Sequence, residues 1–207
     1  MFETGGWDLI TLVDVCAYVG LVAVFLATAN ILLGLLIAIR YSPVRFWPHR
    51  RFNIFAIHNW TAYVLLATIV IHPLILLFVN RNRFRLYDIF VPIHSPLQPF
   101  ENTVGAIAAY ILAIVLITSY YRKKFVRRNW KLLHFLVYPA AVLVFIHSIL
   151  TDPNLNGGPI DYLDGGKVFV FICLALIAGA SVWAWRFRVK KDRRERSAHV
   201  GRYAEHS

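Results

Sequence analysis

The stretch WKLLHFLVYPAAVLVFIHSIL, residues 130–150, decides the fold, because it places His134 and His147 thirteen residues apart in one long apolar segment. An earlier apolar segment, residues 52–79, carries His58 and His72, which are fourteen residues apart. An ionisable side chain inside a membrane span is rare and marks a functional site by default. Imidazole is the usual axial ligand of a b-type haem iron. Two histidine pairs therefore predict two b haems.

The composition predicts an all-α integral membrane protein. The 207 residues are 58% hydrophobic and 16% charged, whereas a soluble domain carries about 25% charged residues. A membrane helix needs about 20 apolar residues, and five segments meet that length. They run from about Leu9 to Ile39, Phe52 to Val79, Thr103 to Tyr121, Asn129 to Leu150, and Lys167 to Phe187.

Several other metal and haem sites are unsupported. Cys16 and Cys173 lie in apolar segments and form no CxxC or CxxCH motif, so zinc, thioredoxin-type and c-type haem sites lack their signature. Met1 is the single methionine, which argues against methionine ligation of a haem. The start MFETGGWD lacks a basic region before an apolar core, so we expect no signal peptide.

The distribution of Lys and Arg predicts the orientation. Eighteen of them lie in the connections after the first and third segments and in the tail after the fifth, against four on the other side. The positive-inside rule then places the N-terminus outside and the C-terminus in the cytoplasm. We expect a membrane domain over residues 1–187 and a basic cytoplasmic tail over 188–207 that contacts anionic lipid. Because the charge gathers at membrane boundaries, it does not indicate nucleic-acid binding.

This orientation predicts which histidines pair. The second and fourth segments both run outward, so His58 and His134 belong to the inner leaflet and His72 and His147 to the outer. We therefore expect one haem between His58 and His134 and another between His72 and His147. At a rise of about 1.5 Å per residue, the two sites lie roughly 20 Å apart along the helices.

The spacing of thirteen residues conflicts with a regular helix. At about 100° per residue, fourteen residues return within roughly 40° of one face, whereas thirteen miss it by roughly 140°. Pro139 lies between His134 and His147 and removes a backbone hydrogen bond to the carbonyl of Phe135. A kink or a change of winding at this point would correct the phase.

Two groups of polar residues, three arginines and the four membrane histidines, each have an alternative interpretation that stays open. Arg81, Arg83 and Arg85 follow the outer end of the second segment; they either lie in a solvated loop or bind haem propionates, for which arginine geometry is favourable. The histidines could instead serve a non-redox membrane protein, as structural hydrogen-bonding groups or as pH sensors.

The chain resembles the ferric reductase-like transmembrane domain superfamily over about Phe52 to Leu150. The resemblance rests on the four histidines, on TVGAIAAYILAIVLITS before the third connection, and on the run from Thr118 to Tyr138. The histidine spacings are similar to those of NADPH oxidases, and that run looks most like the small haem-binding subunit of bacterial methionine sulfoxide reductase. The resemblance implies two b haems in a helical bundle that carries electrons across a membrane.

The electron donor is expected to lie elsewhere. The sequence has no GxGxxG loop followed by a soluble domain, which is the usual mark of nicotinamide or flavin binding. We therefore expect an electron-transfer subunit of an oxidoreductase, supplied by a separate cytoplasmic flavoprotein or by membrane quinol. Its acceptor would lie on the outer face, and its location would be the bacterial inner membrane. The alternative is a haem-bearing anchor of a larger quinol-oxidising respiratory complex.

Overall fold

A computed structural model describes residues 12–39, 53–79, 84–152 and 161–204, and all elements in these ranges are helices. Five helices are long and apolar enough to cross a membrane, which confirms the predicted fold class. These spans are Leu12–Ala38, Ile54–Phe78, Pro99–Tyr120, Arg127–Leu150 and Gly165–Lys191.

The spans divide into shorter elements where proline interrupts backbone hydrogen bonding. Pro73 lies inside α2, and the helix tightens into a 3-10 turn, η2, directly after it. Pro99 begins α4, where a missing N–H costs no helical hydrogen bond. The elements are α1 (Leu12–Ala38), α2 (Ile54–Leu74), η2 (Ile75–Phe78), α3 (Leu86–Phe90), η3 (Pro92–His94), α4 (Pro99–Tyr120), η4 (Arg122–Lys124), α5 (Arg127–His134), α6 (Val137–Leu150) and α7 (Gly165–Ala204).

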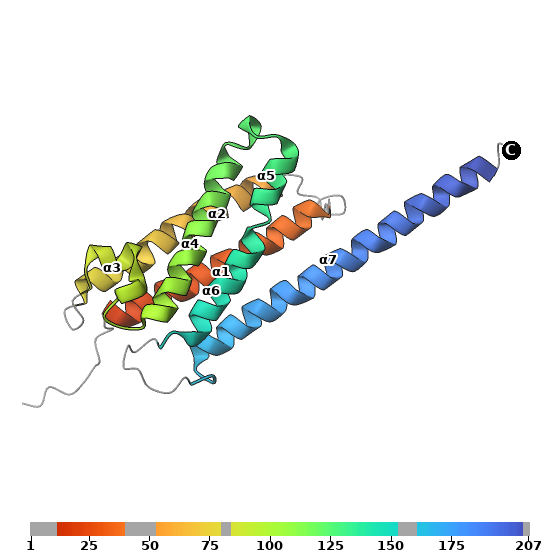
Figure 1. The fold of residues 1–207 in the computed structure, drawn as a ribbon. Helices are drawn as coiled ribbons and strands as arrows, with labels where there is room; N and C mark the ends of the chain where they lie inside the picture. The colour runs from red at the N-terminus through yellow and green to blue at the C-terminus, as the bar shows by residue number, and fades with distance from the viewer. Residues whose placement is uncertain (1–11, 40–52, 80–83, 153–160, 205–207) are drawn as a thin grey trace, which may run out of the picture.

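The helices form a bundle in which α1 packs against α2 and α7, and α4 packs against α6 (Figure 1). Val24, Phe145, Val170 and Cys173 form one buried cluster between α1, α6 and α7. A second cluster joins α1 to α7 further along both helices, through Ile31, Leu35, Ile39 and Ala184. Large apolar side chains also cover the outside of the bundle, as expected of a surface that faces lipid.

The fourth predicted span breaks at the expected place. α5 ends at His134 and α6 begins at Val137, so Phe135 and Leu136 lie outside both helices. Pro139 has no N–H to offer the carbonyl of Phe135, which accepts instead from the backbone N–H of Tyr138 at 3.1 Å. This tightened turn is the change of winding that the spacing of thirteen residues required.

Two side chains hold the end of α6 to its neighbours. Gln98 accepts a hydrogen bond from the backbone N–H of Asp152 and donates one to the carbonyl of Asp152, both at 2.9 Å. Lys167 is 4% exposed and donates from Nζ to the carbonyls of Ile149 and Thr151, at 2.5 and 2.9 Å. A cation at the C-terminal end of a helix also interacts favourably with its dipole.

The longest helix runs past the bundle. α7 has 40 residues, which correspond to about 60 Å, and its C-terminal part continues beyond the ends of the other helices (Figure 1). It crosses the predicted domain boundary at residues 187/188 without a break.

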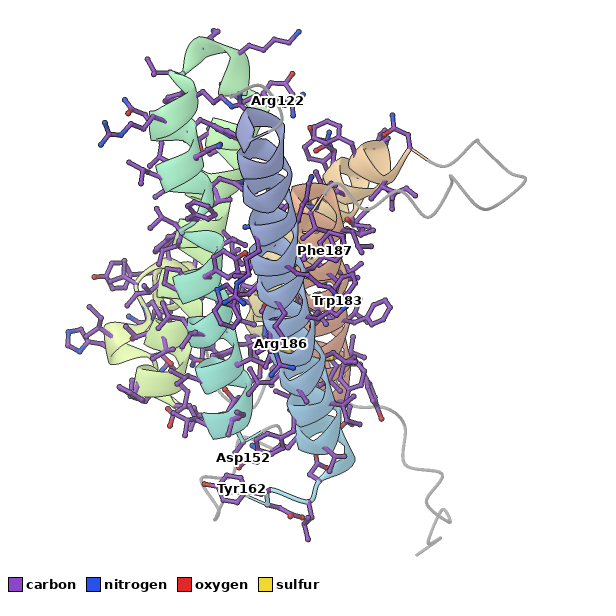
Figure 2. The ribbon with its side chains drawn as sticks, turned by 90° about the vertical axis from the view of Figure 1, so that its right-hand side faces the viewer. Arg122, Asp152, Tyr162, Trp183, Arg186 and Phe187 are labelled. Carbon is purple, nitrogen blue, oxygen red and sulfur yellow. The ribbon has the colours of Figure 1, made fainter. Side chains whose placement is uncertain are left out.

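Arg122 and Asp152 lie at opposite ends of the bundle (Figure 2).

Candidate functional site: two facing pairs of histidines

The structure brings the four membrane histidines together as two pairs. The ring centroids of His58 and His134 are 6.4 Å apart, with an interplanar angle of 70°. The centroids of His72 and His147 are also 6.4 Å apart, at 79°. We call these the inner pair and the outer pair. The cross-helix combinations are those expected from sequence depth.

Two different helix geometries produce this arrangement. On α2 the spacing of fourteen residues returns His58 and His72 to nearly one face of a single helix. On the partner span, His134 is the last residue of α5, and His147 belongs to α6. The interruption between them lets both imidazoles face α2.

Three of the four imidazoles form the same hydrogen bond through Nδ1. His58 bonds to the carbonyl of Asn30 at 3.1 Å, His72 to that of Cys16 at 3.0 Å, and His147 to that of Glu101 at 2.8 Å. A carbonyl oxygen can only accept, so Nδ1 of each ring carries the proton. The lone pair of Nε2 is then available to a metal ion, and this is how most metal-binding histidines are held.

Side chains on α1 strengthen two of these contacts. Asn30 donates from Nδ2 to the carbonyl of His58 at 2.6 Å and to Oγ1 of Thr61 at 2.7 Å. Cys16 donates from Sγ to the carbonyl of His72 at 3.3 Å. Asn30 therefore contacts His58 twice, through its side chain and through its carbonyl, and Cys16 contacts His72 in the same two ways.

Glycines make room for these three rings. Each lies four residues after the carbonyl acceptor: Gly20 after Cys16, Gly34 after Asn30, and Gly105 after Glu101. An added Cβ would lie 2.9 Å from Cε1 of His72 at Gly20, 3.4 Å from Cε1 of His58 at Gly34, and 2.9 Å from Cε1 of His147 at Gly105. The close approach at Gly20 and Gly105 leaves no space for a methyl group.

The fourth imidazole is held differently. Nδ1 of His134 lies 3.1 Å from Oγ of Ser119, a side-chain hydroxyl on α4. Ser119 follows Gly105 by fourteen residues, so it occupies the position that a fourth glycine would have. The indole of Trp130 stacks on the same imidazole, with centroids 5.2 Å apart and an angle of 24°.

A cavity of about 910 Å³ opens beside the inner pair. Its wall includes both inner histidines, apolar side chains of α1, α2, α4 and α6, and a basic rim. Trp130 also lines this cavity, and its buried Nε1 has no hydrogen-bond partner among the described residues. Such an orphaned donor suits a ligand that brings an acceptor oxygen. The rim consists of Arg122, Lys123, Lys124 and Arg188.

The residues fit two bis-imidazole haems. Imidazole nitrogen binds a transition-metal ion at about 2.0 Å, so two imidazoles on opposite faces of one iron have centroids about 6 Å apart. Both pairs show 6.4 Å. Across the described ranges, no group of three or more His, Cys, Asp or Glu side chains could hold a metal ion, so the two-ligand pairs suit haem better than a four-ligand zinc site.

The predicted arginine cluster is placed only in part. Arg85 precedes α3, where its backbone N–H donates to Asp88 at 2.8 Å, and it is not part of the cavity wall. Arg81 and Arg83 lie outside the described residues. Binding of propionates by these three arginines stays a prediction.

Sequence reasoning missed several residues of the site. The basic connection after α4 was used only for orientation, although Arg122, Lys123 and Lys124 line the inner cavity. Gly20 and Gly34 make room for the rings of His72 and His58, and the spacing of fourteen residues between them equals that between His58 and His72. This repeated spacing on two helices was the available signal.

The chain is a helical bundle of five candidate membrane spans. Inside it, two histidine pairs each bring their imidazoles within 6.4 Å of one another, an arrangement suited to stacked haems. A family model described as Ferric reductase like transmembrane component matches residues 23–145, more than half of the chain. The chain therefore belongs to the ferric reductase-like transmembrane family, which confirms the resemblance. No curated protein and no solved structure gave a match.

Family membership suggests a membrane electron-transfer subunit. The match begins inside α1 and ends inside α6, so it includes three of the four membrane histidines. His147 follows the last matched residue by two positions. The five apolar helices and the family together identify an integral membrane protein.

Proposed function

We propose that the chain is a di-haem b-type membrane cytochrome that passes electrons across a bilayer. The observation that carries this proposal is the pair of matched imidazole sites, each with centroids 6.4 Å apart. His58 and His134 would hold the inner haem, and His72 and His147 the outer one. Bound haem would supply the reversible one-electron chemistry of its iron.

The chain's own residues orient the ligands. Nδ1 of each imidazole is engaged by a neighbouring helix, so the ring cannot rotate freely and Nε2 is left available to a metal ion. The basic rim of the inner cavity offers cations to anionic groups, and the orphaned Nε1 of Trp130 offers one more donor. Lipid-facing apolar side chains close the bundle from outside.

The direction of electron flow follows from the proposed orientation, with the N-terminus outside and the C-terminus in the cytoplasm. The donor would be a cytoplasmic flavoprotein or membrane quinol, and the acceptor would lie on the outer face of a bacterial plasma membrane. The supporting observation is the basic rim at the inner end of the bundle, where the positive-inside rule places cytoplasmic residues.

The test begins with haem content. Purified protein is expected to carry two b-type haems per chain in a pyridine haemochrome assay, with a low-spin bis-histidine spectrum. Protein that folds and purifies without haem would contradict the proposal and would favour structural or pH-sensing histidines. Reduction by quinol of the chain alone would distinguish a quinol donor from a flavoprotein donor.

Ligand variants then test the pairing. His72→Ala and His147→Ala should each remove the same haem and leave the other with an unchanged low-spin spectrum, because each change breaks the same site. The double variant should lose no more than either single variant, since residues of one unit are not additive. His94→Ala, an exposed residue of η3, is the matched control and should retain both haems. The pairing is wrong if the two single variants lose spectroscopically different haems.

A further inference from the structure

The four histidine contacts are not equivalent. For His58, His72 and His147 the acceptor is a backbone carbonyl, and a glycine four residues later admits the ring. A backbone carbonyl is present whatever side chain the residue carries. His134 instead bonds to the hydroxyl of Ser119, so its contact depends on the identity of one side chain.

We propose that Ser119 is a positioning residue that holds the Nδ1 proton of His134 and thereby sets the reduction potential of the inner haem apart from that of the outer haem. This inference rests on the proposed function, because it requires His134 to bind iron through Nε2.

The local backbone explains why the serine is needed. On α4, Glu101 provides the carbonyl for His147 and precedes Gly105 by four residues. The equivalent carbonyl for Ser119 is that of Val115, which accepts a hydrogen bond from Oγ1 of Thr118 at 3.1 Å. His134 instead contacts Oγ of Ser119, which lies 3.1 Å from its Nδ1. The hydroxyl therefore replaces the carbonyl as acceptor.

The direction of the hydrogen bond follows from ligation. When Nε2 carries the iron, the proton of neutral imidazole lies on Nδ1, so Nδ1–H donates and Oγ accepts. A hydrogen bond that draws on the Nδ1 proton raises the basicity of the ligand. A more basic imidazole stabilises ferric over ferrous iron, which lowers the reduction potential. Removing the acceptor should raise that potential.

Trp130 limits how far the ring can move in response. Its indole covers one face of His134 at a centroid distance of 5.2 Å, while Ser119 contacts the ring edge at Nδ1. The imidazole is therefore held in its plane by stacking and in its rotation by the hydroxyl. Loss of the hydroxyl would free the rotation while the stacking remains.

The experiment compares Ser119→Ala, Ser119→Thr and the control Thr103→Ala in the purified full chain. Thr103→Ala also removes one hydroxyl from α4, where Oγ1 donates to the carbonyl of Pro99 in the same helix, and Thr103 is not among the residues that line the inner cavity. Optical redox titration gives the two midpoint potentials, and electron paramagnetic resonance reports the ligand geometry of each ferric haem. Each variant is also made with His72→Ala, which should leave only the inner haem, so that its potential is assigned without ambiguity.

In Ser119→Ala the inner midpoint should shift to a more positive value and the inner low-spin signal should broaden, while the outer midpoint stays in place. Ser119→Thr, which keeps the hydroxyl, should keep the wild-type inner value, and Thr103→Ala should leave the inner value unchanged. Selective loss of the inner haem in Ser119→Ala, with retention in Ser119→Thr, would equally support a positioning role. Unchanged midpoints in Ser119→Ala, or equal shifts in all three variants, would overturn the inference and leave the haem proposal intact. A wild-type protein without haem would overturn the proposed function itself.

Discussion

At the scale of single residues, each imidazole owes its orientation to a residue on another helix. His58 and His72 are on α2, but their Nδ1 partners, Asn30 and Cys16, are on α1. For His58, His72 and His147 a glycine on the partner helix also makes room, because each of these rings has to reach a backbone carbonyl. The site is therefore a property of helix pairs and not of the histidine-bearing helices alone.

Gly105→Ala should weaken the outer site. Its new methyl would lie 2.9 Å from both Cε1 and Nδ1 of His147, so the ring must move and its hydrogen bond to the carbonyl of Glu101 must lengthen. We expect lower occupancy or a perturbed low-spin spectrum of the outer haem, measured by haem content and electron paramagnetic resonance.

Gly179→Ala is the matched control, because nothing lies within 4 Å of a Cβ at that position. It should retain both haems with wild-type spectra. Gly34→Ala, with its nearest contact at 3.4 Å, should have a smaller effect than Gly105→Ala. Equal haem content and equal spectra in all three variants would show that close packing at Gly105 does not position His147.

Part of this site could be predicted from the sequence, for a physical reason. A histidine in an apolar segment is conspicuous because its burial is costly, so His58, His72, His134 and His147 are identifiable from hydropathy and spacing alone. A glycine in a membrane helix is common and carries no such cost. Its role as the neighbour of a ring depends on which helix packs against it, and the repeated spacing of fourteen residues is the one sequence signal of that role.

At the scale of elements, the break between α5 and α6 is the feature that the sequence indicated most indirectly. A spacing of thirteen residues would place His134 and His147 on different faces of a regular helix. A local change of winding was therefore required, and Pro139 identified where it could occur. The structure confirms the interruption at Phe135 and Leu136. The length of α7 could not be predicted, because a highly charged stretch is compatible with either a helix or an irregular tail.

Pro139→Ala should reduce occupancy of the inner haem. The new N–H could donate to the carbonyl of Phe135, which favours one continuous helix through α5 and α6. In a continuous helix His134 would be turned roughly 140° from the face of His147, and it would no longer face His58. Haem content and the spectrum of the remaining haem measure the effect.

The outer haem serves as the internal control for this change, because His147 lies eight residues beyond Pro139 on α6. It should keep its wild-type midpoint potential. Retention of both haems with unchanged spectra would mean that packing of α5 against α4, and not the proline, maintains the break.

At the scale of the whole molecule, the two ends of the bundle differ in charge. Arg122 lies at the end opposite Asp152 (Figure 2), and the inner cavity opens at the end that carries the basic rim. Trp183, Arg186 and Phe187 lie along α7 on the face shown in Figure 2. The family match and the five spans establish the membrane protein, whereas the orientation still rests on the positions of Lys and Arg.

A reporter fusion tests that orientation. A reporter that is active only outside the cytoplasm should be inactive when it is fused after Ser207 and active when it is inserted after Asp152. The reason is the excess of Lys and Arg beside the C-terminal side of the bundle, eighteen against four. The opposite pattern of activity would exchange the inner and outer assignments of both histidine pairs.

The separation of His58 and His72 along α2 has an electrical consequence. Fourteen residues correspond to about 20 Å, which is roughly two-thirds of a hydrocarbon core about 30 Å thick. One charge that crosses the full membrane gains or loses about 2.3 kcal/mol per 100 mV. In the proposed orientation, the free energy of an electron that moves from the inner to the outer pair would therefore fall by about 1.5 kcal/mol per 100 mV of an inside-negative voltage. A voltage of about 100 mV would shift the distribution of electrons between the two sites about tenfold toward the outer pair. Each electron that crosses would also discharge part of that voltage.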